Sequence, residues 1–167
     1  MLRKRPPRRP VTASQAVDAG AAGAAAVALL ARRDFCSSEL RDSLTAQGFE
    51  STTVAGVITE LAERGFLSDE RYAQHYVSHH AERGQGPLRI RRELEQLGLD
   101  ATLIEQALEA GEDWARRARE VRIRRFGLPL PSSWAQKAKQ ARFLQYRGFS
   151  NDHIRAALGS EVIDSLS

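Results

Sequence analysis

Three glycines recur in this chain at a constant interval of 50 residues: Gly48, Gly98 and Gly148. The apolar residues around them recur at the same offsets, which indicates one structural unit written three times. Such repeat arrays present long surfaces to partners and seldom build a catalytic pocket. The matching positions, which lie before and after each glycine, are Leu44, Leu94 and Leu144; Phe49, Leu99 and Phe149; Val54, Ile104 and Ile154; and Ile58, Leu108 and Leu158.

The apolar residues follow the period of an α-helix along most of the chain. Val54, Val57, Ile58 and Leu61 form one such stripe, at the spacing that places side chains on one helix face. No alternating β-branched stretch is long enough for a strand, so the sequence predicts an all-α protein. Nine short helices are expected, held by packing more than by propensity. They cover about 14–33, 38–48, 53–64, 69–83, 87–98, 102–110, 113–126, 134–147 and 151–158.

Polar residues and glycines predict where these helices begin and end. Ser37 or Ser38 is expected to cap the second helix, and Ser150 or Asn151 the ninth, since their side chains can accept from backbone amides. Ser68 is expected to cap the fourth helix. The spaced glycines are expected to end helices in the left-handed conformation. Gly84 and Gly86 are expected to end the fourth helix.

The helices group into three tandem three-helix repeats, which we expect to form an elongated, curved array. The repeats are predicted to cover residues 14–67, 68–111 and 112–160. Residues 1–13 hold prolines among basic side chains and are predicted to be a disordered basic arm. Residues 161–167 form a C-terminal tail with one amphipathic turn.

The net charge of +4 hides an uneven distribution. Residues 1–10 carry +5, residues 11–111 carry −6, residues 112–158 carry +7 and residues 159–167 carry −2. Basic ends suit a polyanion or an acidic protein groove. The acidic centre argues against a chain that wraps nucleic acid along its whole length.

The cysteine usage and the N-terminal segment bear on the compartment. Cys36 is the single cysteine, which excludes an intrachain disulfide and fits a reducing environment. Arg3-Lys4-Arg5 followed by Ala19–Ala31 superficially resembles a secretion signal, but the run has few strongly apolar residues. No stretch approaches the length of about 20 apolar residues that spans a membrane. We expect a cytoplasmic protein with no membrane partner.

A dense group of arginines in the third repeat is the sharpest candidate for a binding surface. Guanidinium groups bind phosphate and carboxylate with two parallel hydrogen bonds, so both kinds of target stay open. Among the residues around these arginines, Glu120 is the local ion-pair partner that we expect. The six arginines fall within ten residues: Arg116, Arg117, Arg119, Arg122, Arg124 and Arg125.

A smaller basic patch lies in the second repeat at Arg89, Arg91 and Arg92. Glu93 and Glu95 follow directly and can pair with these arginines. A solvated helix face and a partner contact are about equally good interpretations of this patch.

Three segments resemble those of the RecX regulatory proteins. They are Leu67–Ala73, Gly86–Leu94 with Leu97-Gly98-Leu99, and Lys137-Ala138 with Arg142–Ser150. The segments occur in the right order within the repeat frame, and the resemblance covers about residues 24–160. Lys137, Arg142 and Arg147 lie in the third segment and complete the candidate binding residues.

The resemblance implies a fold and a role. RecX proteins are tandem three-helix repeats that bind the RecA recombinase and restrain its filament on DNA. The resemblance therefore implies a monomeric modulator of recombination and of the SOS response that inhibits RecA. It implies no catalytic residues, cofactor or metal, and single- or double-stranded DNA stays open as a further partner.

A helical DNA-binding module is the main alternative, with contacts through the basic arm and the third repeat. In helix-turn-helix proteins the last helix of such a unit enters the major groove. Here the outward residues of those helices include Glu60, Glu63, Glu105 and Glu109 in the first two repeats. Phosphates repel carboxylates, which disfavours this alternative.

A metal-dependent enzyme is the other alternative. His75 and His79 stand four residues apart on one predicted helix, a spacing that can grip zinc. A zinc site needs a third and usually a fourth ligand, and no further ligand stands at a suitable spacing. A partly exposed helix face is the better interpretation of these histidines.

Overall fold

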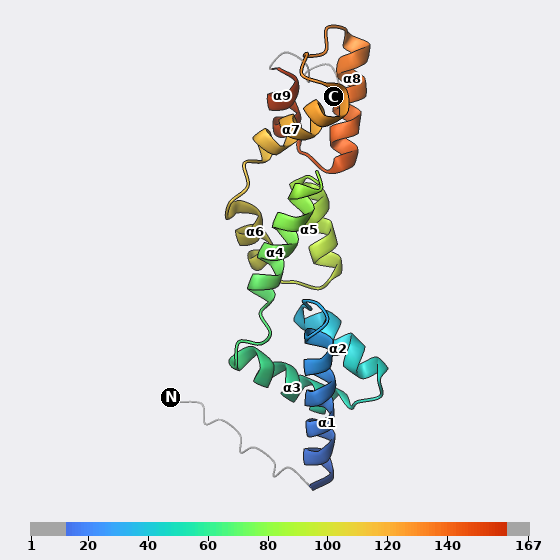
Figure 1. Ribbon diagram of the computed structural model, residues 1–167, viewed down its shortest axis with the longest axis vertical. Coiled ribbons are helices and arrows are strands. Elements are labelled where there is room, and N and C mark those ends of the chain that lie inside the picture. The colour runs from blue at the N-terminus through green and yellow to red at the C-terminus, as the bar shows by residue number, and fades with distance from the viewer. Residues whose placement is uncertain (1–12, 160–167) are drawn as a thin grey trace, which may run out of the picture. The chain divides into compact units, whose positions relative to one another are not determined.

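The computed structural model describes residues 13–159, which form nine helices and no strand (Figure 1). The all-α prediction is confirmed for this part of the chain. Residues 1–12, with most of the predicted arm, and the tail from residue 160 lie outside the described residues. In chain order the helices are α1 (Ala13–Leu30), α2 (Ser37–Ala46), α3 (Ser51–Glu63), α4 (Asp69–Glu82), α5 (Pro87–Gln96), α6 (Ala101–Glu109), α7 (Trp114–Phe126), α8 (Trp134–Arg147) and α9 (Asn151–Leu158).

The helices pack in three successive groups of three. In each group every helix contacts the other two: the first bundle is α1–α3, the second is α4–α6 and the third is α7–α9. The chain divides into two compact units after Ser68. The first unit holds the first bundle, and the second unit, from Asp69 onward, holds the second and third bundles. The prediction of tandem three-helix groups is therefore confirmed.

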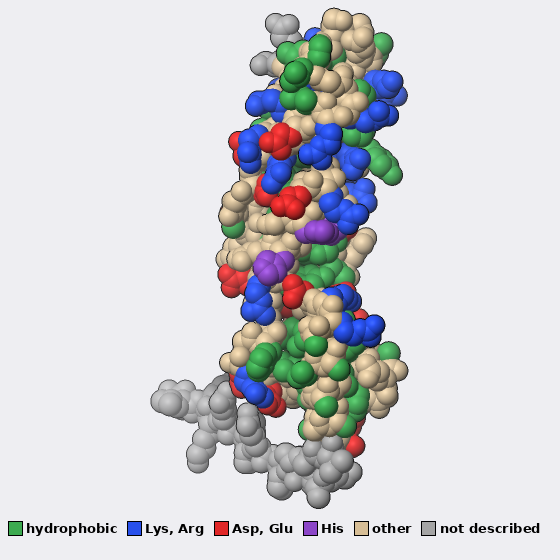
Figure 2. Space-filling view, in the orientation of Figure 1, with side chains coloured by type: hydrophobic (Ala, Val, Ile, Leu, Met, Phe, Trp, Pro, Cys, Tyr) green, Lys and Arg blue, Asp and Glu red, His purple; other side chains and the backbone are tan. Residues whose placement is uncertain are grey.

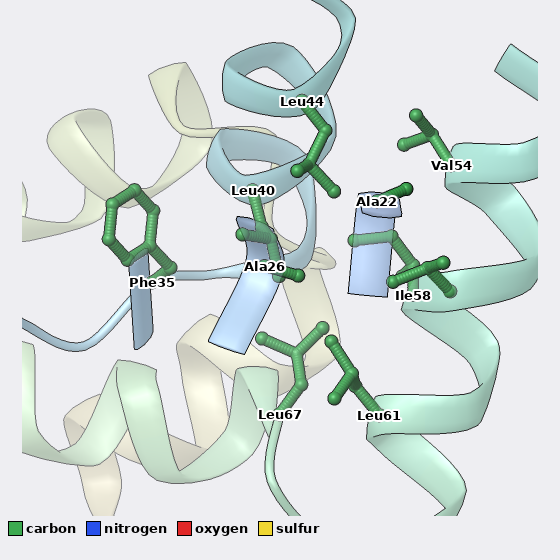
Figure 3. Packing of buried hydrophobic residues seen from close by; sticks show 10 residues of the cluster. Ala22, Ala26, Phe35, Leu40, Leu44, Val54, Ile58, Leu61 and Leu67 are labelled. Atoms are coloured by element: carbon green, nitrogen blue, oxygen red, sulfur yellow. The ribbon is translucent and has the colours of Figure 1, made fainter. Parts of the chain in front are cut away.

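The core of the first bundle is built on small residues of α1. Ala22 and Ala26 lie one turn apart on the helix and are fully buried. Figure 3 shows Leu40 and Leu44 of α2 and Ile58 of α3 beside them. Because the alanine side chains are small, α2 and α3 can approach α1 closely. The Ala-rich character of α1 therefore has a direct packing role.

The three spaced glycines end their helices in the left-handed conformation, as predicted. Their φ angles are +94° at Gly48, +76° at Gly98 and +92° at Gly148, a region that glycine enters without a steric penalty. The amide of the next residue donates back to the leucine carbonyl four residues before the glycine, at 3.1–3.3 Å. This bond defines a Schellman turn, in which the two flanking residues also pack on each other. The recurring leucine and the recurring apolar residue are therefore the two ends of one local motif.

Helix ends differ from the predictions at a few positions. α1 ends at Leu30 rather than near residue 33, and Cys36 rather than a serine precedes the first residue of α2. Ser150 caps α9, since its hydroxyl accepts from the amide of His153. Gly84 has a φ of +81° just after α4, whereas Gly86 is the N-cap of α5 and does not end α4. The prediction for Gly86 was wrong because its role depends on a distant segment.

That distant segment is the end of α8. The amide of Gly86 donates to the carbonyl of Arg147 at 2.8 Å, and the amide of Leu88 donates to the carbonyl of Gly148 at 3.0 Å. Amides in the first turn of a helix and carbonyls in the last turn have no partner within their own helix. The start of α5 and the end of α8 therefore satisfy each other, and Pro87 between the two donors has no amide to leave unpaired.

Glycine is required at positions 86 and 148 because the start of α5 and the end of α8 lie so close together. A Cβ atom on Gly86 would overlap the carbonyl of Gly148, and a Cβ on Gly148 would overlap the backbone of Arg89. A second tie joins the same two bundles, because the indole nitrogen of Trp114 donates to the carbonyl of Leu108 at 2.9 Å. The second and third bundles are thus joined backbone to backbone, and we call this contact the glycine junction.

Substitution of Leu94 tests the packing of the second bundle. The side chain is fully buried, so Leu94→Ala should lower the free energy of unfolding of the second unit by about 2–5 kcal/mol. The fluorescence of Trp114 and Trp134, which both lie in this unit, reports its unfolding in urea. Leu88→Ala, at a side chain that is 42% exposed, is the matched control and should cost much less. Equal losses for the two variants would contradict the assigned core.

Three glycine substitutions separate backbone strain from close approach at the glycine junction. Gly48→Ala introduces left-handed strain alone, because no atom lies near its added Cβ, and should cost about 1–2 kcal/mol in the first unit. Gly86→Ala introduces overlap alone, because its φ of −90° suits any residue, and should cost about 1–3 kcal/mol. Gly148→Ala combines both effects.

Amide hydrogen exchange at Leu88 is the local measurement for this series. Gly86→Ala and Gly148→Ala should speed the exchange of this amide, because its acceptor is displaced, whereas Gly48→Ala should not. Unchanged protection in all three variants would show that the junction does not hold these bundles together.

Candidate functional site

The six arginines of α7 do not share one face. Successive residues of a helix are turned by about 100°, so a run of neighbours points in every direction. Ala118 and Val121 of the same helix are buried and define its inward side. The structure therefore sorts the arginines into one buried side chain, two ion-paired side chains and three exposed ones.

Arg122 is the buried member, with 2% of its surface exposed. Its guanidinium donates to the carbonyls of Leu128 and Pro129, both at 3.0 Å. These bonds fasten the loop between α7 and α8 onto α7. The prediction that Arg122 binds a partner is therefore wrong, because its guanidinium is enclosed and both of its terminal nitrogens donate to carbonyls of this loop.

Arg116 and Arg117 are ion-paired. Arg117 lies 2.7 Å from Glu112 and 3.6 Å from Glu120, and Arg116 lies 3.7 Å from Glu120. The hydrogen bond to Glu112 raises the pKa of Arg117 above its usual value, against the opposing effect of burial. The sequence analysis missed Glu112 as a partner because this residue precedes the helix.

The other three arginines of α7 are exposed: Arg119, Arg124 and Arg125. None of them forms an ion pair with a carboxylate of residues 13–159. Their charges are therefore not compensated by a carboxylate in this part of the chain, and a contact with a partner stays a prediction.

In the second bundle, two of the three arginines of the smaller patch are ion-paired. Arg89 lies 2.9 Å from Glu93, one of the partners expected from the sequence. Arg91 lies 2.8 Å from Glu105 of α6, a partner that only the packing of α5 on α6 supplies. Arg92 is exposed and has no ion pair among the described residues.

The basic residues predicted on α8 have different surroundings. Arg142 is exposed, with its Nε atom 3.4 Å from the carbonyl of Ala138. Lys137 is half-buried, as is Arg147, whose guanidinium lies over the ring of Phe143 at 5.4 Å. Figure 2 shows Lys and Arg side chains gathered on the second unit around α7, α8 and the adjoining ends of α4 and α5.

Arg124, Arg125 and Arg147 come together around a hollow of about 120 Å³. Arg83, at the end of α4, is the fourth arginine of this hollow. Arg83 is not predicted as a site residue from the sequence, because it lies apart from the arginine clusters. No local signal places it beside arginines that follow 41 to 64 residues later.

One histidine of α4, His80, lies at the contact with α5, with its Nδ1 atom 3.7 Å from Glu93. The ring of His80 stacks on Tyr76 with centroids 4.0 Å apart, and its Nδ1 atom lies 2.7 Å from the side-chain oxygen of Gln85. The hydroxyl of Tyr76 donates to Glu93 at 3.1 Å. His75 and His79 are exposed, and residues 13–159 contain no group of three or more metal-ligating side chains.

The last helices of the first two bundles carry acidic outer faces. Glu60 and Glu63 of α3 and Glu109 of α6 are exposed. Insertion of these helices into a DNA groove would bring carboxylates against phosphates. Separately, no helix within the described part is both long and apolar enough to cross a membrane.

Comparison with known families identifies the repeats. The model of the second three-helix domain of RecX matches residues 68–108, and that of the third three-helix domain matches residues 111–158. The chain belongs to the RecX family. The regulatory protein RecX of Halorhodospira halophila is 44% identical over 145 residues, which cover 84% of this chain and 90% of that protein. The RecX of Ectopseudomonas mendocina is 43% identical over 131 residues, with 78% and 87% covered.

Solved RecX structures share the fold. The crystal structure of RecX from Lactobacillus salivarius superposes with a TM-score of 0.76 at 23% identity and covers 85% of this chain and 95% of that one. A second RecX crystal structure gives a TM-score of 0.73 at 21% identity, with 86% and 73% covered. These likenesses confirm the helical repeat array predicted from the sequence.

The glycine junction explains two of the segments that resemble RecX. Gly86–Leu94 begins α5, and Arg142–Ser150 ends α8 and passes through Gly148. Both segments meet where the second and third bundles join. Gly86 and Gly148 therefore hold the second and third bundles together.

The buried Arg122 leads to a stability prediction. Each hydrogen bond from a charged group contributes about 1.5–3 kcal/mol, so Arg122→Ala should lower the stability of the second unit by about 3 kcal/mol. Arg119→Ala, at an exposed position of the same helix, should change it by less than about 0.5 kcal/mol. Urea unfolding followed by tryptophan fluorescence measures both. A loss below about 1 kcal/mol for Arg122→Ala would mean that its bonds to the loop are dispensable.

Proposed function

We propose that this protein binds RecA filaments in the cytoplasm and inhibits their recombination, ATPase and coprotease activities. The observation that carries the proposal is membership of the RecX family, whose relatives are named regulatory proteins. It acts as a monomer, without a catalytic step, cofactor or metal of its own.

The exposed cations of the second unit support this proposal. Arg92, Arg119 and Arg142 have no ion pair among the described residues. A RecA filament on DNA presents phosphates and protein carboxylates, and guanidinium groups bind both with paired hydrogen bonds. These three arginines are the contacts that we assign to the filament.

The glycine junction supports a mechanism of inhibition. Because the second and third bundles are joined through backbone hydrogen bonds, the helices that carry these arginines are held in one arrangement. A rigid ligand that contacts two neighbouring protomers favours the protomer arrangement that its surface fits. Binding of this kind would hold the filament away from the arrangements that exchange strands and hydrolyse ATP.

Co-sedimentation with preformed RecA filaments, together with a RecA ATPase assay, tests the proposal. Reversal of charge in Arg119→Glu with Arg142→Glu should weaken filament binding about tenfold or more and relieve ATPase inhibition in parallel. Arg32→Glu with Arg41→Glu, at two exposed positions of the first bundle, is the control with the same change in charge.

The results separate three cases. Loss confined to the first pair supports the assigned contacts. Equal loss in both pairs would show that net charge alone drives the binding. No sedimentation of the unaltered protein with RecA filaments, but a gel shift with DNA alone, would replace the proposal with the DNA-binding alternative.

A further inference from the structure

The hollow at the glycine junction has an apolar floor and a basic rim. Its floor is formed by Gly84, Val121 and Phe143, which come from three different segments of the second unit. A Cβ atom on Gly84 would lie 3.0 Å from Val121, so the glycine keeps the end of α4 close to α7. The rim consists of the four arginines, Arg83, Arg124, Arg125 and Arg147.

Aromatic rings contact two of these guanidiniums and leave their charge uncompensated. Arg147 lies over the ring of Phe143 at 5.4 Å, and Arg125 lies 5.7 Å from the ring of Phe126. The two rings meet edge to face at 5.3 Å, which fixes their orientation. Cation–π contacts at such distances orient a guanidinium while its N–H groups stay available.

None of the four rim arginines forms an ion pair with a carboxylate within residues 13–159. The polar side-chain contact of Arg83 is with the ring of His79 at 3.5 Å. Four like charges around one small hollow repel one another, so an anion that enters the hollow relieves this repulsion. The arrangement therefore favours an anionic ligand.

The size of the hollow limits that anion. The hollow is small, with a volume of about 120 Å³, and it opens to solvent. One phosphate group fits such a space, and its oxygens can accept from several guanidiniums at once. A larger ligand can place only one such group in the hollow, with the rest of the ligand outside.

The adjoining face of α8 extends the basic surface and adds an exposed ring. Lys139, Arg142 and Tyr146 lie three or four residues apart, beside the stripe of Phe143 and Arg147 that lines the hollow. Tyr146 is 79% exposed, so its ring is open to a partner. Cations along a groove with an exposed aromatic ring are the combination that binds single strands, with phosphates on the cations and a base on the ring.

We propose that this hollow binds a backbone phosphate of single-stranded DNA and that Tyr146 stacks on a neighbouring base. An acidic protein segment would match the charges but would leave the exposed tyrosine without a role. A duplex would present no free base to the ring. The binding is a property of the second unit alone and does not depend on RecA, so free DNA tests it separately from the proposed regulation of RecA.

Fluorescence anisotropy with a labelled oligothymidine of about 15 nucleotides measures this binding in the full chain. Arg124→Gln with Arg125→Gln should weaken it about tenfold or more, and should lower the salt dependence of log K by about 0.7 for each lost phosphate contact. Arg124→Lys with Arg125→Lys should bind with intermediate affinity, because the charges stay and the paired hydrogen bonds are lost.

Arg64→Gln with Arg155→Gln is the control, since it removes the same charge from positions that pair with Glu60 and Asp152. It should change the affinity by less than about twofold. Equal affinity of the hollow variant and the unaltered protein, an equal loss in the control, or no binding by the unaltered protein would each overturn the proposal. Loss of filament binding with unchanged affinity for free DNA would also overturn it, and would assign the hollow to an acidic protein.

The role of Tyr146 has its own test. Tyr146→Ala should weaken binding to the oligothymidine about fivefold or more, because each stacked base contributes strongly, and should not affect an abasic strand of the same length. An equal effect on both strands would exclude stacking on Tyr146. Circular dichroism and tryptophan fluorescence of every variant check that the fold is unchanged.

Discussion

The contact of two glycine backbones at the junction of the second and third bundles determines most of what the second unit can do. Gly86 and Gly148 approach so closely that no side chain fits at either position. The start of one helix thereby satisfies the end of another, and Leu88 adds the second hydrogen bond. This contact places Arg147 near Arg83, two residues that lie far apart in the sequence. The packing of the two bundles and the candidate binding surface consequently depend on the same contact.

Helix α7 shows why charge density is an incomplete guide to a binding surface. Its arginines are near neighbours in the sequence, yet the buried Arg122 donates to the loop that follows α7 and Arg117 is ion-paired with Glu112. Only some side chains of the run remain available to a partner. The two that line the hollow, Arg124 and Arg125, gain their significance from residues of α4 and α8. A binding surface is therefore formed by side chains from several helices and cannot be identified from one run of charged residues.

The repeated skeleton and the varied surface have separate roles in this member of the RecX family. Each bundle repeats the same glycine turn with its leucine and its following apolar residue. The exposed faces differ: Glu60 and Glu63 make the last helix of the first bundle acidic, whereas exposed arginines and Lys139 mark the third. A common fold can thus carry different contacts along a single partner, which suits the proposed regulation of a repeating filament.

The sequence by itself determined the helical class, the three-helix repeats and the left-handed turns at Gly48, Gly98 and Gly148. These features depend on residues within one helix and its following turn, where the number of residues between two positions fixes how they lie relative to each other. Only the tertiary structure decided that Arg122 is buried, that Gly86 meets the end of α8, and that four arginines surround one hollow. Those outcomes depend on segments that are distant along the chain, so no local spacing contains them.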